Sequence, residues 1–339
     1  MVSALKRLGF DKVFDTNTGA DFTIMEEATE FVKRFKENDN LPMTTSCCPG
    51  WVRFAEMEYP ENLSHLSSCK SPHQMFGAII KSYYAEKNKI DPKNIYVVSV
   101  MPCIAKKFER QREEMKVNGL WDVDSVITTR ELARMIKQAN IEFDKLEDET
   151  FDSPMGEATG AAAIFGVTGG VMEAALRTAY ELITGKELKK LEFEEIRGAK
   201  GIKKATVQIG DKEVKVAVAH GLSNARKIME EIKNGTSDYQ FVEVMACPGG
   251  CIMGGGQPIK SSKTRSEIDV RKLRADALYS IDEKSVIRKS HENPVIKQMY
   301  EDFLQKPGSE VSHKYLHTHY SKKELYDSLL YTSPSPRDA

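Results

Sequence analysis

The sequence has little cysteine and tryptophan, and almost no excess of charge of either sign. Of its 339 residues only six are cysteine and two are tryptophan, and 49 basic residues offset 50 acidic ones to give a net charge of −1. This balance lacks the electrostatic signature of proteins that bind nucleic acid or an anionic membrane. We therefore expect neither a nucleic acid nor a membrane as a partner.

The sequence also lacks long apolar runs. No stretch approaches the ~18 apolar residues of a membrane span. The first ten residues have the pattern of a short amphipathic helix rather than of a secretory signal. Reduced thiolates that serve as metal ligands agree with a reducing compartment. The sequence therefore predicts a cytoplasmic protein.

Five of the six cysteines lie in three short motifs framed by glycine and proline. The motifs are TSCCPGW with Cys47 and Cys48, MPCIAK with Cys103, and MACPGGC with Cys247 and Cys251, which continues into GGGQP. A bulky inorganic core needs close approach of the backbone, which glycine permits, and backbone N–H groups that point at its sulfides tune its potential. The motifs therefore indicate one shared metal centre.

The spacing of these cysteines favours iron and sulfur over zinc or disulfides. A structural zinc site usually draws on two Cys-x-x-Cys units, whereas here one pair is spaced Cys-x-x-x-Cys and the other ligands come singly from distant segments. Iron–sulfur clusters are held by four thiolates. The alternative is a set of plain buried cysteines, since free cysteine is often buried. We expect that role only for Cys69, which lies outside the motifs.

In this order and with these flanking residues, the motifs resemble the catalytic-domain signatures of iron–iron (FeFe) hydrogenases, from about residue 8 to about residue 320. The resemblance implies a cubane 4Fe-4S cluster joined through one cysteine sulfur to a two-iron unit with carbonyl, cyanide and a bridging azadithiolate. It makes four residues the cubane ligands, with the last as the bridge: Cys48, Cys103, Cys247 and Cys251. Cys47 would then relay protons to the bridging amine.

A line of polar side chains would connect that thiol to solvent. Glu27, Glu30 and Arg34 are spaced i, i+3 and i+7 and so share one helix face, with Arg34 placed to pair with Glu30. From the residues alone, a solvated charged face is the favoured interpretation. The resemblance instead implies a proton path from Cys47 through Glu27, Ser67 and Glu30 to Arg34. Burial would raise the pKa of a carboxylate on such a path.

Other residues of the motifs are candidates for holding the cofactor. Lys106 would donate to a cyanide as a compact cation, whereas Lys107 is expected at the surface. Met101 and Met245 each precede a ligand cysteine by two residues, and polarisable thioethers would pack against diatomic ligands. As isolated residues they would more often be plain core. Pro102, between Met101 and Cys103, is a further candidate for contact with the cofactor.

Two further groups have plainer interpretations. His313, His317 and His319 have a spacing that could bind a metal, although their position near a terminus makes this the less favoured interpretation. Glu173 and Arg177 are predicted to lie on a helix surface. At the start of the helix that follows Ser67, His73 stands where the family often carries glutamine, which puts the role of that position in doubt.

The pattern of elements predicts an α/β fold. Helices are expected over 21–37, opened by a capping box of Thr23 with Glu26, and over 129–139, opened by Thr128 with Glu131. Further elements are predicted at 72–87 and 168–184 as helices, at 95–100 and 241–245 as strands, and at 205–219 as a hairpin. Two of the strands lead straight into ligand cysteines, so the cluster is expected in a crevice beyond their carboxyl ends.

We expect two lobes, each a small mixed twisted sheet flanked by helices, with the cluster in the cleft between them. The predicted division is a first lobe at 1–150, a second lobe with a C-terminal helical segment at 151–320, and a tail at 321–339. Residues 331–339 carry two prolines and no period, which predicts disorder and a segment that is not native. The resemblance also implies an N-terminal truncation, because the family's domain normally begins some tens of residues earlier.

The predicted function is the reversible reduction of protons to H2. No cysteine remains to build an accessory cluster, so electrons are expected from ferredoxin or another small electron carrier, or else from a partner subunit lost with an absent N-terminal region. Maturation proteins are implied as further partners. The alternative is a hydrogenase-like iron–sulfur protein with a cubane only, acting as a cluster-assembly scaffold or redox sensor. The intact TSCC and MPC motifs favour the enzyme.

Overall fold

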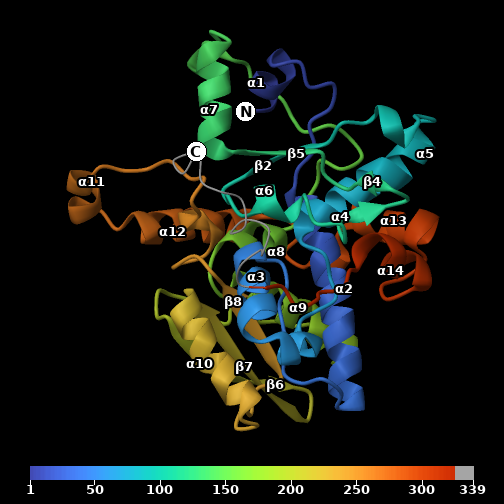
Figure 1. Cartoon of the computed structure of the whole chain (residues 1–339). Helices are drawn as coiled ribbons and strands as arrows, with labels where there is room; N and C mark the ends of the chain where they lie inside the picture. Colours follow the sequence, from blue (N-terminus) through green and yellow to red (C-terminus); the bar gives the residue numbers. More distant parts are fainter. Residues whose placement is uncertain (325–339) are drawn as a thin grey trace, which may run out of the picture.

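The larger of two main sheets lies in the lower half of the molecule (Figure 1), in a computed structural model that describes residues 1–324. Its strand order is β1-β8-β7-β6, and β6 and β7 are antiparallel while the other pairs are parallel. The strands are β6 (Ile202–Ile209), β7 (Lys212–His220), β8 (Phe241–Met245) and the short β1 (Met43–Thr44). The sheet is therefore mixed, as predicted, and the predicted hairpin is its β6–β7 pair.

The second sheet is a parallel pair. It joins β2 (Val98–Met101) to β5 (Ser125–Thr128), and a separate two-residue ribbon joins β3 (Lys116–Val117) to β4 (Leu120–Trp121). The predicted strand at 95–100 therefore begins three residues later than expected, at Val98. Both β2 and β8 end at a methionine two residues before a motif cysteine.

Helices surround both sheets. Those of the first 160 residues are α1 (Val2–Arg7), α2 (Asn17–Glu37), α3 (Pro49–Glu58), α4 (Pro72–Ile79), α5 (Ala85–Lys87), α6 (Lys106–Glu109) and α7 (Thr129–Gln138). The later ones are α8 (Gly160–Ala163), α9 (Gly170–Thr184), α10 (Leu222–Lys233), α11 (Ser262–Glu267), α12 (Val270–Lys284), α13 (Pro294–Met299) and α14 (Glu310–Leu316). A π-helical turn, η2 (Ile80–Tyr84), joins α4 to α5, so the predicted helix at 72–87 is one nearly continuous element.

The start of α2 differs from the prediction. The helix begins at Asn17, and the Thr23 hydroxyl donates to the Gly19 carbonyl inside the helix instead of capping it. Glu26 reaches into the core, where it accepts hydrogen bonds from other segments. The helix extends backwards because the residues before Thr23 are also buried, which favours helical packing over a turn. The capping box of Thr128 with Glu131 is confirmed at α7.

The prediction of a surface position for Glu173 and Arg177 is wrong. Both side chains are fully buried in α9, and Arg177 pairs with Glu173 at 2.7 Å and with Asp282 of α12 at 2.8 Å. Arg197 also pairs with Glu173. The pair is interior because α2 and strands β6 and β8 pack against α9, and Asp282 of α12 reaches Arg177. Nothing in the local sequence indicates a partner 105 residues away.

The two sheets do not follow a division of the chain at residue 150. Strand β1 comes from the first range and pairs with β8 of the second, and α2 packs along α9. The boundary of the two lobes therefore stays a prediction. The predicted disorder of residues 331–339 lies outside the described residues.

The Arg177 cluster predicts a large loss of stability from one substitution. Arg177→Met would leave the carboxylates of Glu173 and Asp282 buried with one cation fewer, which costs about 3–5 kcal/mol for a broken buried pair. Lys272→Ala removes an exposed pair with Asp276 and should cost less than about 0.5 kcal/mol. Urea denaturation followed by circular dichroism measures both. Equal midpoints for the two variants would contradict this account.

Candidate metal centre

Four loop cysteines stand at the ends of secondary-structure elements. Cys103 follows β2 and Cys247 follows β8, both past the carboxyl end of a strand. Cys48 is the residue before α3, whose first position is Pro49. Cys251 opens a single 3-10 turn, η7 (Cys251–Met253). Each cysteine is thus fixed by a rigid element that begins or ends beside it.

The loop that carries Cys247 and Cys251 contacts both of the other motifs. The Ala246 N–H group donates to the Cys48 sulfur at 3.4 Å, and the Gly256 N–H group donates to the Pro102 carbonyl at 2.8 Å. The three motifs therefore meet at one place, although they are separated by up to 200 residues of sequence.

Electrostatics indicate that the four sulfurs are neighbours. Burial, followed by the charges of Cys48 and Cys103, raises the pKa of the Cys247 thiol to about 11. Burial, followed by the charges of Cys48 and Cys103, also raises the pKa of Cys251. Four thiolates brought together in this way need a cationic group among them.

Two glycines are required by close contacts in the same loop. Gly250 has φ +96°, and a Cβ there would lie 2.7 Å from the Gly166 carbonyl oxygen and 3.0 Å from the Met245 sulfur. A Cβ at Gly254 would lie 2.3 Å from the Pro102 carbonyl oxygen. Only glycine permits this approach of backbones. All six cysteines are free, so the four-thiol set with its glycine-rich backbone fits an iron–sulfur cluster.

Lys106 is buried beside these loops. Its ammonium donates to the Glu109 carboxylate at 3.0 Å and approaches the Cys47 carbonyl at 3.4 Å. The same Glu109 oxygen accepts from the Ser71 hydroxyl at 2.9 Å and lies 2.5 Å from His73 Nε2. Burial lowers the pKa of His73 to about 4, so this ring is neutral at pH 7. Glu109 therefore orients Lys106. The sequence predicted no role for Glu109, although its position three residues after Lys106 on a helix could have indicated the pair.

The remaining candidates for cofactor contact also lie at this place. Met101 and Met245 are buried at the ends of β2 and β8. The Pro102 carbonyl is occupied by the bond from Gly256. Lys107, in contrast, is partly exposed and pairs with Glu131 at 2.6 Å.

Glu27 is the most unusual carboxylate near the centre. It is fully buried in α2, and neither of its oxygens makes a hydrogen bond of normal geometry, although Ser67 and the backbone of Ser46 lie near it. Burial, aided by the charge of Glu30, raises the pKa of Glu27 to about 8. Burial raises the pKa of Cys47 as well, with Glu27 as the foremost charge acting on it. The thiol and the carboxyl are therefore neighbours.

From Glu27 the line of polar groups continues outward. The Ser67 hydroxyl donates to Glu30 Oε2 at 3.0 Å, and Arg34 donates to Glu30 Oε1 at 2.6 Å. Arg34 also donates to the Ser64 carbonyl, and its side chain is 15% exposed. Ser67, Glu30 and Arg34 are therefore hydrogen-bonded to one another toward the surface, with Glu27 near Ser67 at the inner end. The path itself stays a prediction.

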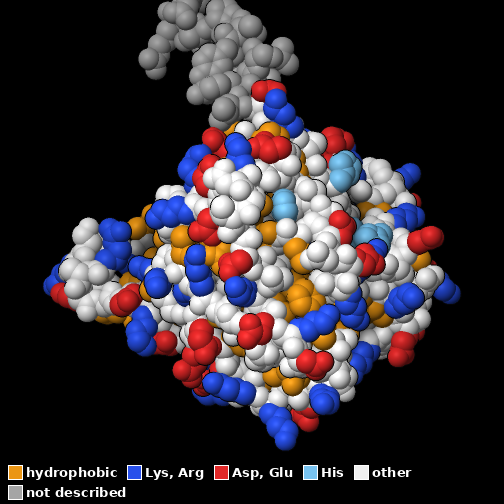
Figure 2. Space-filling view, turned by 90° about the horizontal axis from the view of Figure 1, so that it is seen from below, with side chains coloured by type: hydrophobic (Ala, Val, Ile, Leu, Met, Phe, Trp, Pro, Cys, Tyr) orange, Lys and Arg blue, Asp and Glu red, His pale blue; other side chains and the backbone are white. Residues whose placement is uncertain are grey.

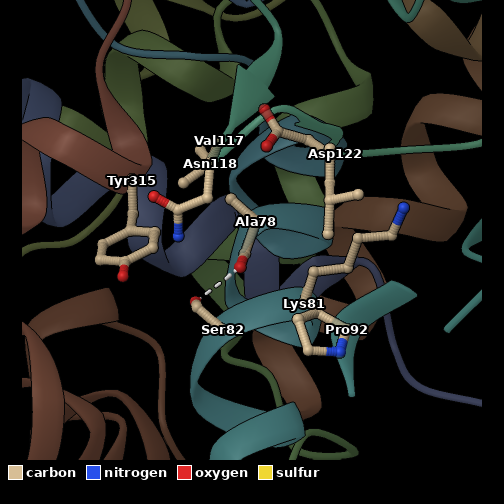
Figure 3. Close-up of a pocket in the computed structure, with 9 residues that line it drawn as sticks. Ala78, Lys81, Ser82, Pro92, Val117, Asn118, Asp122 and Tyr315 are labelled. Carbon is tan, nitrogen blue, oxygen red and sulfur yellow. Dashed lines mark hydrogen bonds between the residues drawn. The ribbon is translucent and has the colours of Figure 1, made fainter. Parts of the chain in front are cut away.

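Other surface features lie apart from this centre. Figure 3 shows a pocket whose lining includes Ala78, Lys81, Asp122 and Tyr315, and no predicted site residue lines it. Figure 2 shows acidic and basic side chains interspersed over the face in view, without a patch of one sign. Within residues 1–324, no helix is long and apolar enough to cross a membrane.

The fold and the site define an α/β protein with a four-thiol centre of the iron–sulfur type. A sequence profile described as iron only hydrogenase large subunit, C-terminal domain, matches residues 1–255, and one described as iron hydrogenase small subunit matches residues 268–323. The chain belongs to the iron-only hydrogenase large-subunit family.

Curated relatives agree with this assignment. The chain is 55% identical over 330 residues to the NADP-reducing hydrogenase subunit HndD of Solidesulfovibrio fructosivorans, a match that covers 96% of this chain and 56% of that protein. It is 55% identical over 261 residues to the periplasmic [Fe] hydrogenase large subunit of Nitratidesulfovibrio vulgaris, covering 76% of this chain and 62% of that protein. The chain thus spans little more than half the length of these relatives.

Solved structures share the fold. The apo [FeFe]-hydrogenase HydA1 from Chlamydomonas reinhardtii matches with a TM-score of 0.82 and 42% identity over 95% of this chain and 87% of that one. A more distant relative is Protein NAR1 of Arabidopsis thaliana, 34% identical over 94% of this chain and 72% of that protein.

Glu27 predicts a pH dependence of stability. The pKa of Glu27 is about 8 in the folded chain and 4.5 for an unperturbed glutamate, as in the unfolded chain. The folded state therefore binds an extra proton between these pH values. The contribution of protonated Glu27 to the free energy of unfolding is complete below pH ~4.5 and is lost as the pH rises through about 8. Glu27→Gln should therefore flatten the fall in melting temperature between pH 6 and 9. The same slope in both proteins would show that the carboxyl of Glu27 is already ionised at pH 6.

Proposed function

We propose that this chain is the catalytic domain of an FeFe hydrogenase, which reversibly combines two protons and two electrons into H2. The observation that carries the proposal is the buried carboxyl of Glu27, which lies between Cys47 and the hydrogen-bonded set of Ser67, Glu30 and Arg34. An iron–sulfur protein that only stores or transfers a cluster has no need of a buried carboxyl with a pKa near 8.

Four residues would hold the 4Fe-4S cubane: Cys48, Cys103, Cys247 and Cys251. Cys251 would also bridge to a two-iron unit with carbonyl, cyanide and azadithiolate ligands. When bound, this cofactor supplies the redox chemistry. The Lys106 ammonium would donate a hydrogen bond to a ligand of the cofactor. Met101, Met245 and Pro102 would pack against the cofactor and exclude water.

The residues of this chain would move the protons. Cys47 would hold a proton on its sulfur at the inner end of the path, and Glu27 Oε would exchange it, because a carboxyl with a pKa of about 8 is partly ionised near neutral pH. The Ser67 hydroxyl would pass the proton to Glu30, which Arg34 holds in place at the surface. The last transfer follows the hydrogen bond from Ser67 to Glu30, and the inner ones would need Cys47, Glu27 and Ser67 to close up to hydrogen-bonding distance.

Partners and location follow from the same proposal. Electrons would come from ferredoxin or another small electron carrier, and maturation proteins would install the two-iron unit. The cytoplasm is the proposed location, because free thiols are maintained there.

A cubane-only protein for cluster assembly is the second candidate, supported by the likeness to NAR1 at 34% identity. The hydrogenase relative is more similar, at 55% identity. The two functions differ in the need for a thiol beside the cubane. Cys47, next to Cys48 and facing Glu27, favours hydrogenase activity.

The ligand assignment predicts the iron content of single variants. Cys103→Ala should lower bound iron below that of a 4Fe-4S cluster, since four thiolates are required. Cys69→Ala is the control and should retain all of it. Iron assay and Mössbauer spectroscopy of anaerobically reconstituted protein measure both. A full cluster in Cys103→Ala would remove this residue from the ligand set.

The relay assignment predicts a loss of turnover without a loss of metal. Cys47→Ser should lower hydrogen evolution by about 10²–10⁴-fold, because a hydroxyl is a far weaker acid than a thiol. Cys47→Asp should retain more activity, since a carboxylate still transfers protons. Hydrogen evolution from reduced ferredoxin is measured after anaerobic maturation, with iron content as the control. Loss of iron from Cys47→Ser would instead identify Cys47 as a ligand.

A further inference from the structure

Three side chains of different chemistry meet beside the outer end of the proton path. An oxygen of Glu30, the sulfur of Cys69 and a ring nitrogen of His317 all lie within 4.8 Å of one another. Cys69 and His317 are buried, and the Glu30 side chain is 14% exposed. The sequence alone predicts a core position for Cys69 and places His317 beside two other histidines, so only the fold brings these three residues together.

The backbone fixes two of these residues opposite each other. Cys69 and His317 form an isolated antiparallel bridge, flanked by bonds from the Lys70 N–H group to the Leu316 carbonyl at 2.9 Å and from the Thr318 N–H group to the Ser68 carbonyl at 2.7 Å. Side chains directly opposite in an antiparallel pair share one face and have Cβ atoms about 5 Å apart. Glu30 of α2 approaches the same face, with its Oε2 3.8 Å from the Cys69 sulfur.

The histidine is held as metal-ligating histidines usually are. Its Nε2 lies 2.9 Å from Glu26 Oε2, while Nδ1 faces the Ser68 hydroxyl at 2.8 Å, on the side of Glu30. A carboxylate that accepts from the outer nitrogen fixes the tautomer and makes the other nitrogen a better ligand. Glu26 is itself fixed by the Tyr300 hydroxyl at 2.5 Å and by the Gly308 N–H group at 2.8 Å.

We propose that Glu30, Cys69 and His317 bind one divalent transition-metal ion of the zinc class. One thiolate, one imidazole and one carboxylate are zinc ligands, and three protein ligands leave a fourth position for water. On binding, the Cys69 thiol releases its proton to solvent. The Ser68 hydroxyl, which bridges Glu30 Oε2 at 3.2 Å and His317 Nδ1, rotates away.

The neighbouring cation does not occupy the same oxygen. Arg34 pairs with Glu30 Oε1, whereas Oε2 is the oxygen that faces Cys69. The metal would therefore bind the oxygen that Arg34 does not hold, in place of the hydroxyl hydrogen bonds that Ser67 and Ser68 donate to it. Because Glu30 belongs to the proposed proton path, a bound ion would stop it from exchanging protons. This consequence rests on the proposed function, but the binding itself does not.

The test adds zinc sulfate to the cluster-loaded protein, in which iron already holds the other ligand cysteines. After removal of excess metal we expect one zinc per chain with unchanged iron. X-ray absorption at the zinc edge should show one sulfur at about 2.3 Å and nitrogen or oxygen at about 2.0–2.1 Å. Cys69→Ser should lose the sulfur and the tight binding. Glu26→Gln should weaken zinc affinity by about 10–100-fold through the loss of the carboxylate behind His317.

A second group of side chains could also hold a metal ion and serves as the control. It consists of Glu181, His291 and Glu292 and contains no sulfur ligand. His291→Ala should leave zinc binding unchanged. Zinc that keeps its sulfur in Cys69→Ser, or that disappears in His291→Ala, would overturn the proposed site. Inhibition of hydrogen evolution by zinc, reversed by a chelator and absent in Cys69→Ser, tests the consequence separately. Tight zinc binding at Cys69 without inhibition would uphold the site and contradict the role of Glu30 in proton transfer.

Discussion

The fold is organised around the free-energy cost of burying several cysteine thiolates together. Burial and the charges of neighbouring cysteines raise the pKa of Cys247 and Cys251, so their thiolates are stable only with a compensating cationic group. A polymetallic cluster held by four thiolates supplies that compensation. The glycines at 250 and 254 have contacts that only glycine tolerates, and they allow the third motif to approach the other two.

Buried charged groups of the protein fall into two kinds. Some are fully compensated, such as Lys106 with Glu109 and Arg177 with Asp282, and these hold elements in position. Glu27 is different because neither of its oxygens has a hydrogen-bond partner of normal geometry. A buried carboxyl left uncompensated costs stability, and such a cost at one place is typical of a functional group.

Local motifs made much of the centre predictable. The four loop cysteines, Cys47 and the face shared by Glu27, Glu30 and Arg34 could be singled out because they lie in short motifs or at helical spacing. Their roles were implied by the family resemblance and stay predictions. Long-range contacts could not be singled out in this way: Arg177 was misplaced because its partner Asp282 is distant in sequence, and Glu26 was misread as a capping residue although it bonds to Tyr300. The meeting of Cys69 with His317 likewise depends on tertiary pairing that no local pattern encodes.

The most direct test of the central claim is infrared spectroscopy of the chain after anaerobic maturation. The claim is that the four-thiol centre holds a cubane together with a two-iron unit. This predicts carbonyl and cyanide stretching bands in a sample that contains the full cubane iron. A sample with a complete 4Fe-4S cluster and no such bands after maturation would contradict it, and would assign the chain to the cubane-only proteins.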